Sequence, residues 1–416
     1  MFINPSIFRA YDIRGIYPSD LNEETAHEIG RAFAVYLKEN NIASSKMVVG
    51  HDSRASSPIL KESFIEGAVS EGINILDIGL ATVDMVYFAS GHFNLPAVMI
   101  TASHNSNEWN GFKLMKSAVD FFPAKDLEII INEEKSGVSR EKGKIIVEDI
   151  KDEYVKHVLG AVDMEKIRPM KIAVDMKSDA VGKIFKSVLE KLPVEINAEN
   201  YAFGCAFDSD GDRINFTDER GVAINPSIIG ALMAKYFLKK NHNGKIIYSA
   251  TTGKIVSDTI AACGGEGIRE RAGHSFIERR LKEVGGLFGI EASGHYYFKK
   301  NFYADSGIIS FLTMLDILSN ENKNLSVLTS EFNKYISIPE MNFPVDNPEE
   351  VIKKVAKNFE GYDIDWLDGL TVKTPDFWLN LRSSNTEPLL RLNIEATNEM
   401  VLNRVKDNLV NLIKNK

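Results

Sequence analysis

The sequence predicts a multidomain α/β protein in which helices cover mixed or parallel sheets, followed by a C-terminal domain of α+β type. Three observations support this prediction. The chain has 416 residues, and at roughly 100–200 residues per domain this is too long for a single core. Short β-type runs alternate with helical patterns over most of the chain, which is typical of βαβ units. From Pro339 onward the order changes to one helix, several strands and a final helix.

The alternation can be followed along the first three quarters of the chain. The expected strands are Met47–Gly50, Ala97–Thr101, Ile172–Asp175, Ile246–Ser249 and Leu287–Glu291. Helical patterns lie between them, at Val181–Leu192 and Pro226–Leu238. The second helix begins with Asn225 as a cap and Pro226 at the first helical position, which is a favoured combination.

The last part of the chain contains the elements of an α+β domain. They are a helix at Glu349–Phe359, strands at Leu370–Val372, Trp378–Leu381 and Leu389–Ile394, and a helix at Met400–Asn415. We therefore place domain boundaries near Lys151, Gly221 and Ser330. The expected domains are 1–150, 151–220, 221–330 and 331–416.

The bulk composition argues against several classes of protein. A net charge of -9 disfavours a nucleic-acid or anionic-membrane partner, because both select basic surfaces. The two cysteines, Cys205 and Cys263, form no zinc-type cluster, and we expect a cytoplasmic location. The longest apolar stretch, Ile308–Leu318, is shorter than the roughly 20 residues of a membrane span.

Four segments contain groups suited to chemistry, and the first is Thr101–Asn110, TASHNSNEWN. It follows an expected strand, at the position where α/β proteins place ligands. Ser103 is a candidate nucleophile, with His104, Asn105 and Lys113 as candidate phosphate or proton partners. A polar turn capped by asparagine side chains is the structural alternative.

The second segment is Phe207–Arg213, FDSDGDR, in which three aspartates alternate. Asp208, Asp210 and Asp212 repel one another unless a cation lies between them, and oxygen ligands suit Mg²⁺. Arg213 occupies the position where a calcium-binding EF-hand loop needs glycine. We therefore expect an octahedral Mg²⁺ site with Arg213 placed to hold a phosphate oxygen, the alternative being an acidic surface turn.

The third and fourth segments offer groups for a sugar and for an anion. In Gly289–Phe298, GIEASGHYYF, Glu291 and Ser293 suit sugar hydroxyls and His295 suits proton transfer near neutral pH. In RSSNTEPLLR, the inventory of a small anion cradle is present, namely Arg382, Ser383, Ser384, Asn385 and Thr386. A hairpin turn and a solvated loop are the respective alternatives. Together the four segments supply what phosphoryl transfer needs.

With these motifs in the same order as in the family, the sequence resembles the α-D-phosphohexomutase superfamily, in particular its phosphomannomutase/phosphoglucomutase branch. The shared motifs are FRAYDIRG at 8–15, TASHN at 101–105, DSDGDR at 208–213, GIEASGH at 289–295 and RSSNTEP at 382–388. The resemblance covers the whole chain. It implies three α/β domains and a C-terminal α+β domain around a central cleft.

The resemblance also implies residue roles. Ser103 matches the phosphorylated serine, which joins the three aspartates as a Mg²⁺ ligand, and Arg14 and Lys113 match basic residues near the catalytic phosphate. His104 follows the serine as in the family, and His295 matches a histidine considered for proton transfer. The implied sugar loop contains Glu291 and Ser293, and the implied phosphate loop contains Arg382, Ser384, Asn385 and Thr386.

The implied reaction interconverts hexose 1-phosphate and hexose 6-phosphate through phosphoserine and a hexose 1,6-bisphosphate, which also serves as activator. We expect an isomerase-class phosphomutase, monomeric or homodimeric. Phosphoglucosamine mutase and a sugar-phosphate-binding protein with little turnover remain alternatives, as does a phosphatase. Glu278 stands where the family usually has lysine, and the segment Lys177–Tyr201 is shorter than usual, so we expect a trimmed second domain.

Overall fold

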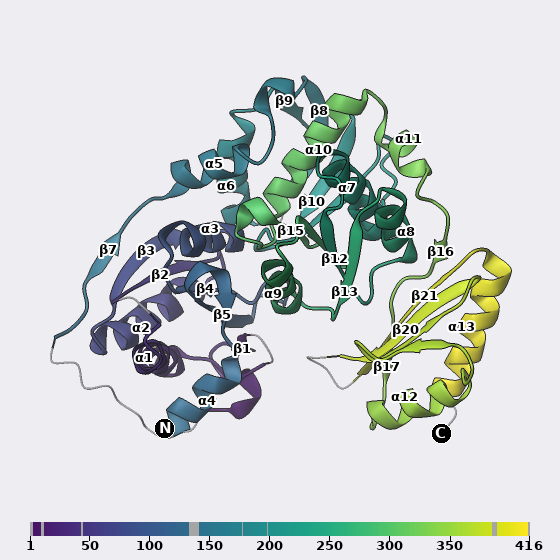
Figure 1. The fold of residues 1–416 in the computed structure, drawn as a ribbon. Helices are drawn as coiled ribbons and strands as arrows, with labels where there is room; N and C mark the ends of the chain where they lie inside the picture. The colour runs from purple at the N-terminus through teal and green to yellow at the C-terminus, as the bar shows by residue number, and fades with distance from the viewer. Residues whose placement is uncertain are drawn as a thin grey trace. The chain divides into compact units, whose positions relative to one another are not determined.

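The computed structural model describes residues 3–9, 12–42, 45–132, 141–176, 178–197, 199–384 and 389–414. Within these residues the chain forms four sheets with their helices (Figure 1). It divides into two compact units. Unit 1 comprises residues 1–221 and 298–322, and unit 2 comprises residues 222–297 and 323–416.

The first sheet of unit 1 has the strand order β1-β5-β4-β2-β3-β7, with β6 paired to β5. Its strands are β1 (Ile13–Ile16), β2 (Lys46–His51), β3 (Asn74–Leu80), β4 (Ala97–Ile100), β5 (Trp109–Lys116), β6 (Asp120–Phe121) and β7 (Ile145–Val147). Strands β4, β2, β3 and β7 are parallel, whereas β5 runs antiparallel to both β4 and β1. Its helices are α1 (Glu23–Glu39), α2 (Ser57–Ser70), α3 (Val83–Phe93) and α4 (Ala124–Asn132).

Helices α1 and α2 pack closely through two glycines. A Cβ atom at Gly30 would lie 2.1 Å from the backbone oxygen of Phe64, and one at Gly67 would lie 2.0 Å from that of His27. No side chain fits at such distances, so glycine sets the helix spacing. Both helices place apolar residues in the core, including Phe33 and Leu60, which are fully buried.

The second sheet of unit 1 has the order β11-β10-β8-β9. Its strands are β8 (Met170–Met176), β9 (Val194–Ile196), β10 (Phe203–Phe207) and β11 (Ile214–Thr217), and its helices are α5 (Lys151–Leu159), α6 (Asp179–Leu189) and α10 (Gly307–Glu321). Helix α10 contains the apolar run noted above, which is buried over most of its length. It returns to unit 1 after the intervening chain and is fixed there by Arg168, whose Nη2 donates to the Leu318 carbonyl at 2.7 Å.

The short segment before the metal loop has a structural explanation. Strand β9 pairs with β8 up to Ile172, and β10 begins opposite the same residue on the other side of β8. The backbone N–H of Asn197 donates to Ile172 and that of Ala202 donates to Lys171. Strands β9 and β10 lie on opposite sides of β8 and are staggered along it. The connection between these two parallel strands therefore contains no helix, although such connections usually do.

Unit 2 contains the remaining two sheets. One has the order β13-β12-β14-β15, and its β12, β13 and β14 are parallel. The bounds are β12 (Lys245–Ser249), β13 (Glu266–Glu270), β14 (Phe288–Ile290) and β15 (Tyr296–Phe298), with α7 (Pro226–Lys240), α8 (Lys254–Ala262) and α9 (His274–Val284). The Asn225 side chain accepts the Ser227 N–H at 2.8 Å, which confirms the predicted cap of α7.

The final sheet is antiparallel, with the order β16-β21-β20-β19-β18 and β17 paired to β21. Its elements are β16 (Ile336–Ser337), β17 (Met341–Pro344), β18 (Asp363–Asp365), β19 (Leu370–Lys373), β20 (Phe377–Ser383) and β21 (Leu389–Ala396), with α12 (Pro348–Lys357) and α13 (Glu399–Lys414). Helix α11 (Leu325–Ser330) packs against α7 instead. The predicted fold class, α/β followed by α+β, is confirmed. The domain boundaries stay a prediction. No helix among the described residues is long and apolar enough to cross a membrane.

Candidate active site

Ser103 lies in a turn directly after β4. Its backbone has a φ of 51°, a left-handed conformation that costs energy for a residue with a Cβ atom. The Ser103 N–H donates to Thr101 Oγ1 at 2.8 Å, and only 4% of the residue is exposed. The turn therefore holds one hydroxyl in a fixed, unusual direction.

Arg54 holds this turn through its backbone, a role that the sequence analysis missed. Its guanidinium donates to the carbonyls of Ser106 at 2.7 Å, Trp109 at 3.0 Å and Asn105 at 2.8 Å, and also to that of Ser103. Asp52 orients Arg54 by accepting its Nε at 3.1 Å. The signal was available, because these two residues follow the end of β2 just as the Ser103 turn follows β4.

The three aspartates lie in a hairpin turn between β10 and β11. These strands pair antiparallel from Phe207 and Ile214 outward, so the flanks are strands and the EF-hand alternative is excluded. Asp208 shapes the turn, since its Oδ1 accepts the N–H groups of Gly211 at 3.1 Å and Arg213 at 3.2 Å. Gly211 has a φ of 83°, which glycine adopts without strain.

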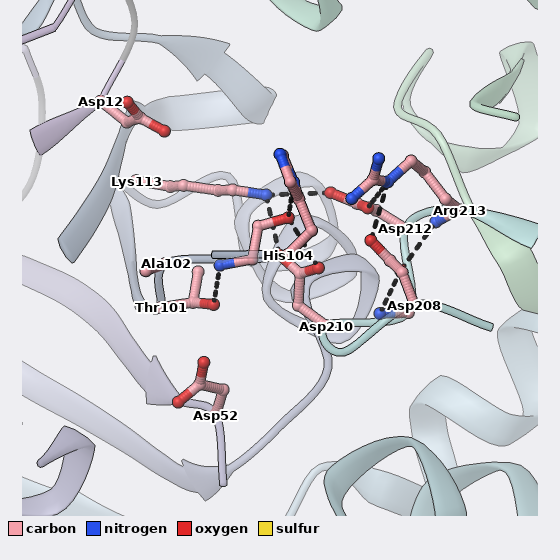
Figure 2. Close-up of polar contacts among 12 residues, drawn as sticks. Asp12, Asp52, Thr101, Ala102, His104, Lys113, Asp208, Asp210, Asp212 and Arg213 are labelled. Carbon is pink, nitrogen blue, oxygen red and sulfur yellow. Dashed lines mark hydrogen bonds and ion pairs between the residues drawn. The ribbon is translucent and has the colours of Figure 1, made fainter. Parts of the chain in front are cut away.

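Lys113 on β5 and the serine turn both contact the aspartate turn within unit 1 (Figure 2). Its Nζ donates to Asp210 Oδ2 at 3.0 Å and to Asp212 Oδ2 at 2.9 Å. The Ser103 hydroxyl donates to Asp210 Oδ1 at 3.0 Å. Burial disfavours the charge on Lys113, but the two carboxylates outweigh it and hold its pKa well above the usual value. Of the predicted partners of Ser103, His104 contacts its hydroxyl and Lys113 contacts Asp210, whereas the Asn105 side chain accepts a hydrogen bond from Arg14 instead.

The aspartate turn fits a divalent cation. One carboxylate oxygen from each of Asp208, Asp210 and Asp212 lies within 4.8 Å of the others. Asp210 and Asp212 are buried, where adjacent negative charges are costly unless a cation neutralises them. Here the Lys113 ammonium supplies part of that neutralisation. Hard oxygen donors in this arrangement are the ligand type that Mg²⁺ prefers.

Two further cationic groups border the serine turn. Arg213 donates through Nε to Asp208 Oδ2 at 2.8 Å, and burial notwithstanding, the nearby aspartates raise its pKa. Arg14 on β1 donates to Asn105 Oδ1 at 2.5 Å and to the Ala102 carbonyl at 3.3 Å. Positive charge therefore lies on both sides of the hydroxyl, which suits a dianionic phosphoryl group.

His104 points its ring toward the serine hydroxyl. The distance from His104 Nδ1 to Ser103 Oγ is 3.3 Å. Partial burial, with the charges of Arg213 and Arg14, lowers the pKa of His104 to about 4. The imidazole is therefore neutral at physiological pH in the unphosphorylated protein, and it can accept or donate a hydrogen bond.

Unit 2 contains a separate pocket of about 310 Å³. Its lining combines polar and apolar groups from both sheets of the unit, including Thr251, Glu291, Ser293, Trp378, Arg382 and Arg391. Glu291 is buried, and its two carboxylate oxygens accept the Gly273 N–H at 2.7 Å and the Tyr297 hydroxyl at 2.6 Å. The pocket thus has a fixed carboxylate on one side and guanidinium groups on the other.

The loop from Glu291 to His295 is a tight turn. The Glu291 N–H donates to the His295 carbonyl at 3.0 Å, and Gly294, with a φ of 90°, donates to Glu291. The hairpin alternative therefore describes the backbone correctly. Ser293 is exposed and His295 is partly exposed, so both side chains keep access to solvent.

Arg382 is the part of the predicted anion cradle that the structure places in the pocket. It lies at the end of β20, and its Nε is buried with no hydrogen-bond partner among the described residues. Ser384 lies just beyond the strand and its N–H donates to the Leu389 carbonyl at 2.8 Å. Asn385 and Thr386 lie outside the described residues.

The unusual Glu278 lies in α9 and is buried. It forms an ion pair with Lys282 one turn later. Arg279, next to it, is largely exposed and approaches Glu283 at 3.8 Å. Position 278 therefore supplies no basic group, and its carboxylate serves a contact within the helix.

Comparison with known proteins agrees with these features. Family models for phosphoglucomutase/phosphomannomutase match over most of the chain: alpha/beta/alpha domain I at residues 5–137, alpha/beta/alpha domain III at 225–335 and the C-terminal domain at 340–412. A phosphomannomutase from Methanocaldococcus jannaschii is 33% identical, over 99% of this chain and 98% of that protein. A phosphoglucomutase from Neisseria gonorrhoeae is 32% identical, over 97% and 96%.

Solved structures give the same result. A phosphoglucomutase/phosphomannomutase family protein from Burkholderia thailandensis superposes with a TM-score of 0.90 at 28% identity, over 99% of this chain and 98% of that one. N-acetylphosphoglucosamine mutase from Aspergillus fumigatus, solved with GlcNAc-6P and magnesium, has a TM-score of 0.66 at 12% identity, over 99% and 96%. The second likeness is one of fold alone.

Proposed function

This chain belongs to the phosphoglucomutase/phosphomannomutase family of phosphohexomutases, and we propose that it interconverts hexose 1-phosphate and hexose 6-phosphate through phosphorylated Ser103. Enzymes of this family catalyse intramolecular phosphoryl transfer and are metal-dependent.

The first half-reaction moves the phosphoryl group from Ser103 to the free hydroxyl of a hexose phosphate. The bond between phosphorus and Ser103 Oγ breaks while a bond to the hexose oxygen forms. The proton of the hexose hydroxyl passes to His295, and the leaving Ser103 Oγ takes a proton from the Lys113 ammonium, which contacts the same carboxylate, Asp210. The product is a hexose 1,6-bisphosphate. In the second half, the bisphosphate turns around and returns its other phosphoryl group to Ser103. The serine proton then returns to Lys113, and His295 gives its proton to the sugar oxygen from which the phosphoryl group leaves.

The chain's own residues prepare Ser103 for this transfer. The left-handed turn and the Thr101 hydrogen bond fix the direction of Oγ, which favours an in-line geometry. Lys113, Arg14 and Arg213 balance the negative charge of the transferred group, and His104 contacts the same oxygen. Phosphoryl transfer depends mainly on such positioning and charge neutralisation.

Asp208, Asp210 and Asp212 would hold Mg²⁺ together with phosphorylated Ser103. A bound Mg²⁺ supplies additional positive charge for the phosphoryl oxygens. The A. fumigatus enzyme of the same fold was solved with magnesium, which supports this choice among divalent cations. With such a cation on Asp210 and Asp212, Lys113, which contacts both carboxylates, would be available to contact the phosphoryl oxygens.

The pocket of unit 2 would bind the substrate. Its volume of about 310 Å³ lies near the lower end of the range for small-molecule sites. Arg382, with Ser384, Asn385 and Thr386, would hold the phosphate that does not react, and Glu291 and Ser293 would bind sugar hydroxyls. The pairing of guanidinium groups with a fixed carboxylate supports a ligand that has both an anionic and a hydroxyl-rich end.

The observation that carries the proposal is the Ser103 hydroxyl, buried 3.0 Å from a carboxylate that Lys113 also contacts. The test is incubation with glucose 1,6-bisphosphate followed by intact-mass analysis. Wild-type protein should gain one phosphate on Ser103, and Ser103→Ala should gain none and lose nearly all mutase activity. Ser106→Ala, an exposed serine of the same loop, is the matched control and should behave like wild type.

A coupled assay with mannose 1-phosphate, glucose 1-phosphate and glucosamine 1-phosphate, each primed with bisphosphate, separates the remaining alternatives. Preference for glucosamine 1-phosphate would identify a phosphoglucosamine mutase. Binding without phosphorylation or turnover would identify a sugar-phosphate-binding protein. Release of inorganic phosphate faster than isomerisation would identify a phosphatase. A cytoplasmic location remains our prediction from the cysteine content.

A further inference from the structure

Strand β7 is the outermost strand of the first sheet and has one neighbour among the described residues. It pairs in parallel with β3, and the flanking backbone bonds run from the Ile75 N–H to the Lys144 carbonyl at 2.7 Å and from the Glu148 N–H to the Asp77 carbonyl at 3.0 Å. Residues 144, 146 and 148 therefore direct their backbone groups toward β3. In a strand the intervening residues point the other way, so Ile145 and Val147 direct N–H and C=O groups to the open edge.

The side chains of β7 are also exposed to solvent. Ile145 is 54%, Ile146 48% and Val147 78% exposed. Sheets usually protect such an edge by keeping the strand very short, as β7 is, and also with a charge, a proline or a bulge within the strand. The three consecutive β-branched residues of β7 include no charge, proline or bulge. Such an edge is suited to strand addition.

The sequence of this edge is complementary to itself. If a second copy approaches antiparallel with Ile146 opposite Ile146, each Ile145 faces a Val147 and each Lys144 faces a Glu148. The facing residues 145 and 147 are those whose backbone groups point outward, so they can exchange two hydrogen bonds on each side of the two-fold axis. A register shifted by one residue would place each outward-facing residue opposite one whose backbone groups already bond to β3, so these hydrogen bonds could not form. Apolar and opposite-charge cross-strand pairs both stabilise antiparallel sheets.

We propose that two copies of this chain associate through β7, joining their first sheets into one continuous antiparallel sheet across a two-fold axis. A contact of this kind is isologous, as in most homodimers. The pairing strands have only three residues each, so we expect a contact smaller than the roughly 1,200 Å² of a standard stable interface. The dimer is therefore concentration-dependent and dissociates on dilution.

The test is sedimentation velocity of the full chain over a micromolar to millimolar range, with charge reversal at the strand ends. Lys144→Glu places two glutamates opposite each other at both ends, and Glu148→Lys does the same with lysines. Each variant alone should dimerise about tenfold more weakly or worse, because favourable pairs become repulsive. An equimolar mixture of the two should recover wild-type affinity, since every cross-strand pair is again opposite in charge.

Two further variants complete the design. Val147→Pro removes an N–H that points to the open edge and leaves the bonds to β3 intact, so it should abolish dimerisation while mutase activity stays at the wild-type level. Lys171→Glu, which reverses an exposed lysine on β8, should leave the dimer unchanged. A wild-type chain that remains monomeric throughout would overturn the proposal. So would a dimer that Val147→Pro leaves intact, or a mixture of the reversed variants that fails to recover.

Discussion

Replacing Lys113 by methionine tests the charge balance of the proposed metal site. Lys113 is 4% exposed and contacts Asp210 and Asp212 at 3.0 and 2.9 Å. Methionine keeps the length of the side chain and removes its charge, which leaves two buried carboxylates without their ammonium partner. Breaking a buried pair in this way costs about 3–5 kcal/mol. We expect a loss of that size in the free energy of unfolding when the protein is kept in EDTA.

Magnesium should restore much of this loss, because the cation neutralises the same carboxylates. At a Mg²⁺ concentration of about 100 times its Kd, binding to the folded state alone adds about 2.7 kcal/mol. The measurement is urea unfolding with and without Mg²⁺, followed by tryptophan fluorescence, to which Trp109 on β5 contributes with two other tryptophans. The matched control is Lys61→Met, which breaks a 2.6 Å pair with Asp77 in the same sheet and should show no larger gain from Mg²⁺ than wild type.

Two results would refute this reasoning. One is a Lys113→Met variant that unfolds in EDTA at the same urea concentration as wild type. This would mean that the lysine does not neutralise the charge of the aspartates. The other is an equal stabilisation of both lysine variants by Mg²⁺, which would place the cation elsewhere. A loss of activity in Lys113→Met that Mg²⁺ does not restore is compatible with the expectation, because the lysine also serves the phosphoryl group.

Three further predictions concern other parts of the chain. Arg382→Ala should raise KM about 10–100-fold with a smaller change in kcat, since a charged hydrogen bond contributes about 1.5–3 kcal/mol. The measurement is steady-state kinetics, with Arg404→Ala, at an exposed residue of α13, as the control. An equal rise in KM for both variants would contradict the prediction. Burial raises the pKa of Asp84 to about 6 from 3.8, so its contribution to stability is present below pH 3.8 and is lost as the pH rises to about 6. Asp84→Asn should therefore gain up to about 3 kcal/mol relative to wild type between pH 3.5 and 7.5, and parallel urea-unfolding curves at all pH values would disprove it. Gly253→Ala would place a Cβ 2.3 Å from Glu395 Oε1. This would disturb the carboxylate that accepts the first N–H of α8 at 2.8 Å and lower the free energy of unfolding by about 1 kcal/mol. A variant with a raised Tm would count against this contact.

The sequence by itself determined the fold class and the order of the motifs. Strand and helix patterns depend on the spacing of apolar residues, which is a local property, and for this reason β4, β12 and α7 were recognised close to their actual bounds. Asn225 and Pro226 marked the start of α7 for the same reason. The three aspartates were recognised as an ion site because their repulsion is evident at any spacing this short.

Only the tertiary structure decided which side chains meet. Lys113 is ten residues from Ser103 but nearly a hundred from Asp210, and the contact among the three depends on how two sheets of unit 1 pack. The contacts of Arg54 with the serine turn have the same origin. Its place after the end of β2 was visible in the sequence, but its partners are backbone carbonyls, which the sequence does not identify. The staggered β9 and β10, and the open edge of β7, arise from strand pairing. Hydrogen bonding between strands joins residues that are far apart in sequence, so the amino-acid sequence alone does not show which strands pair.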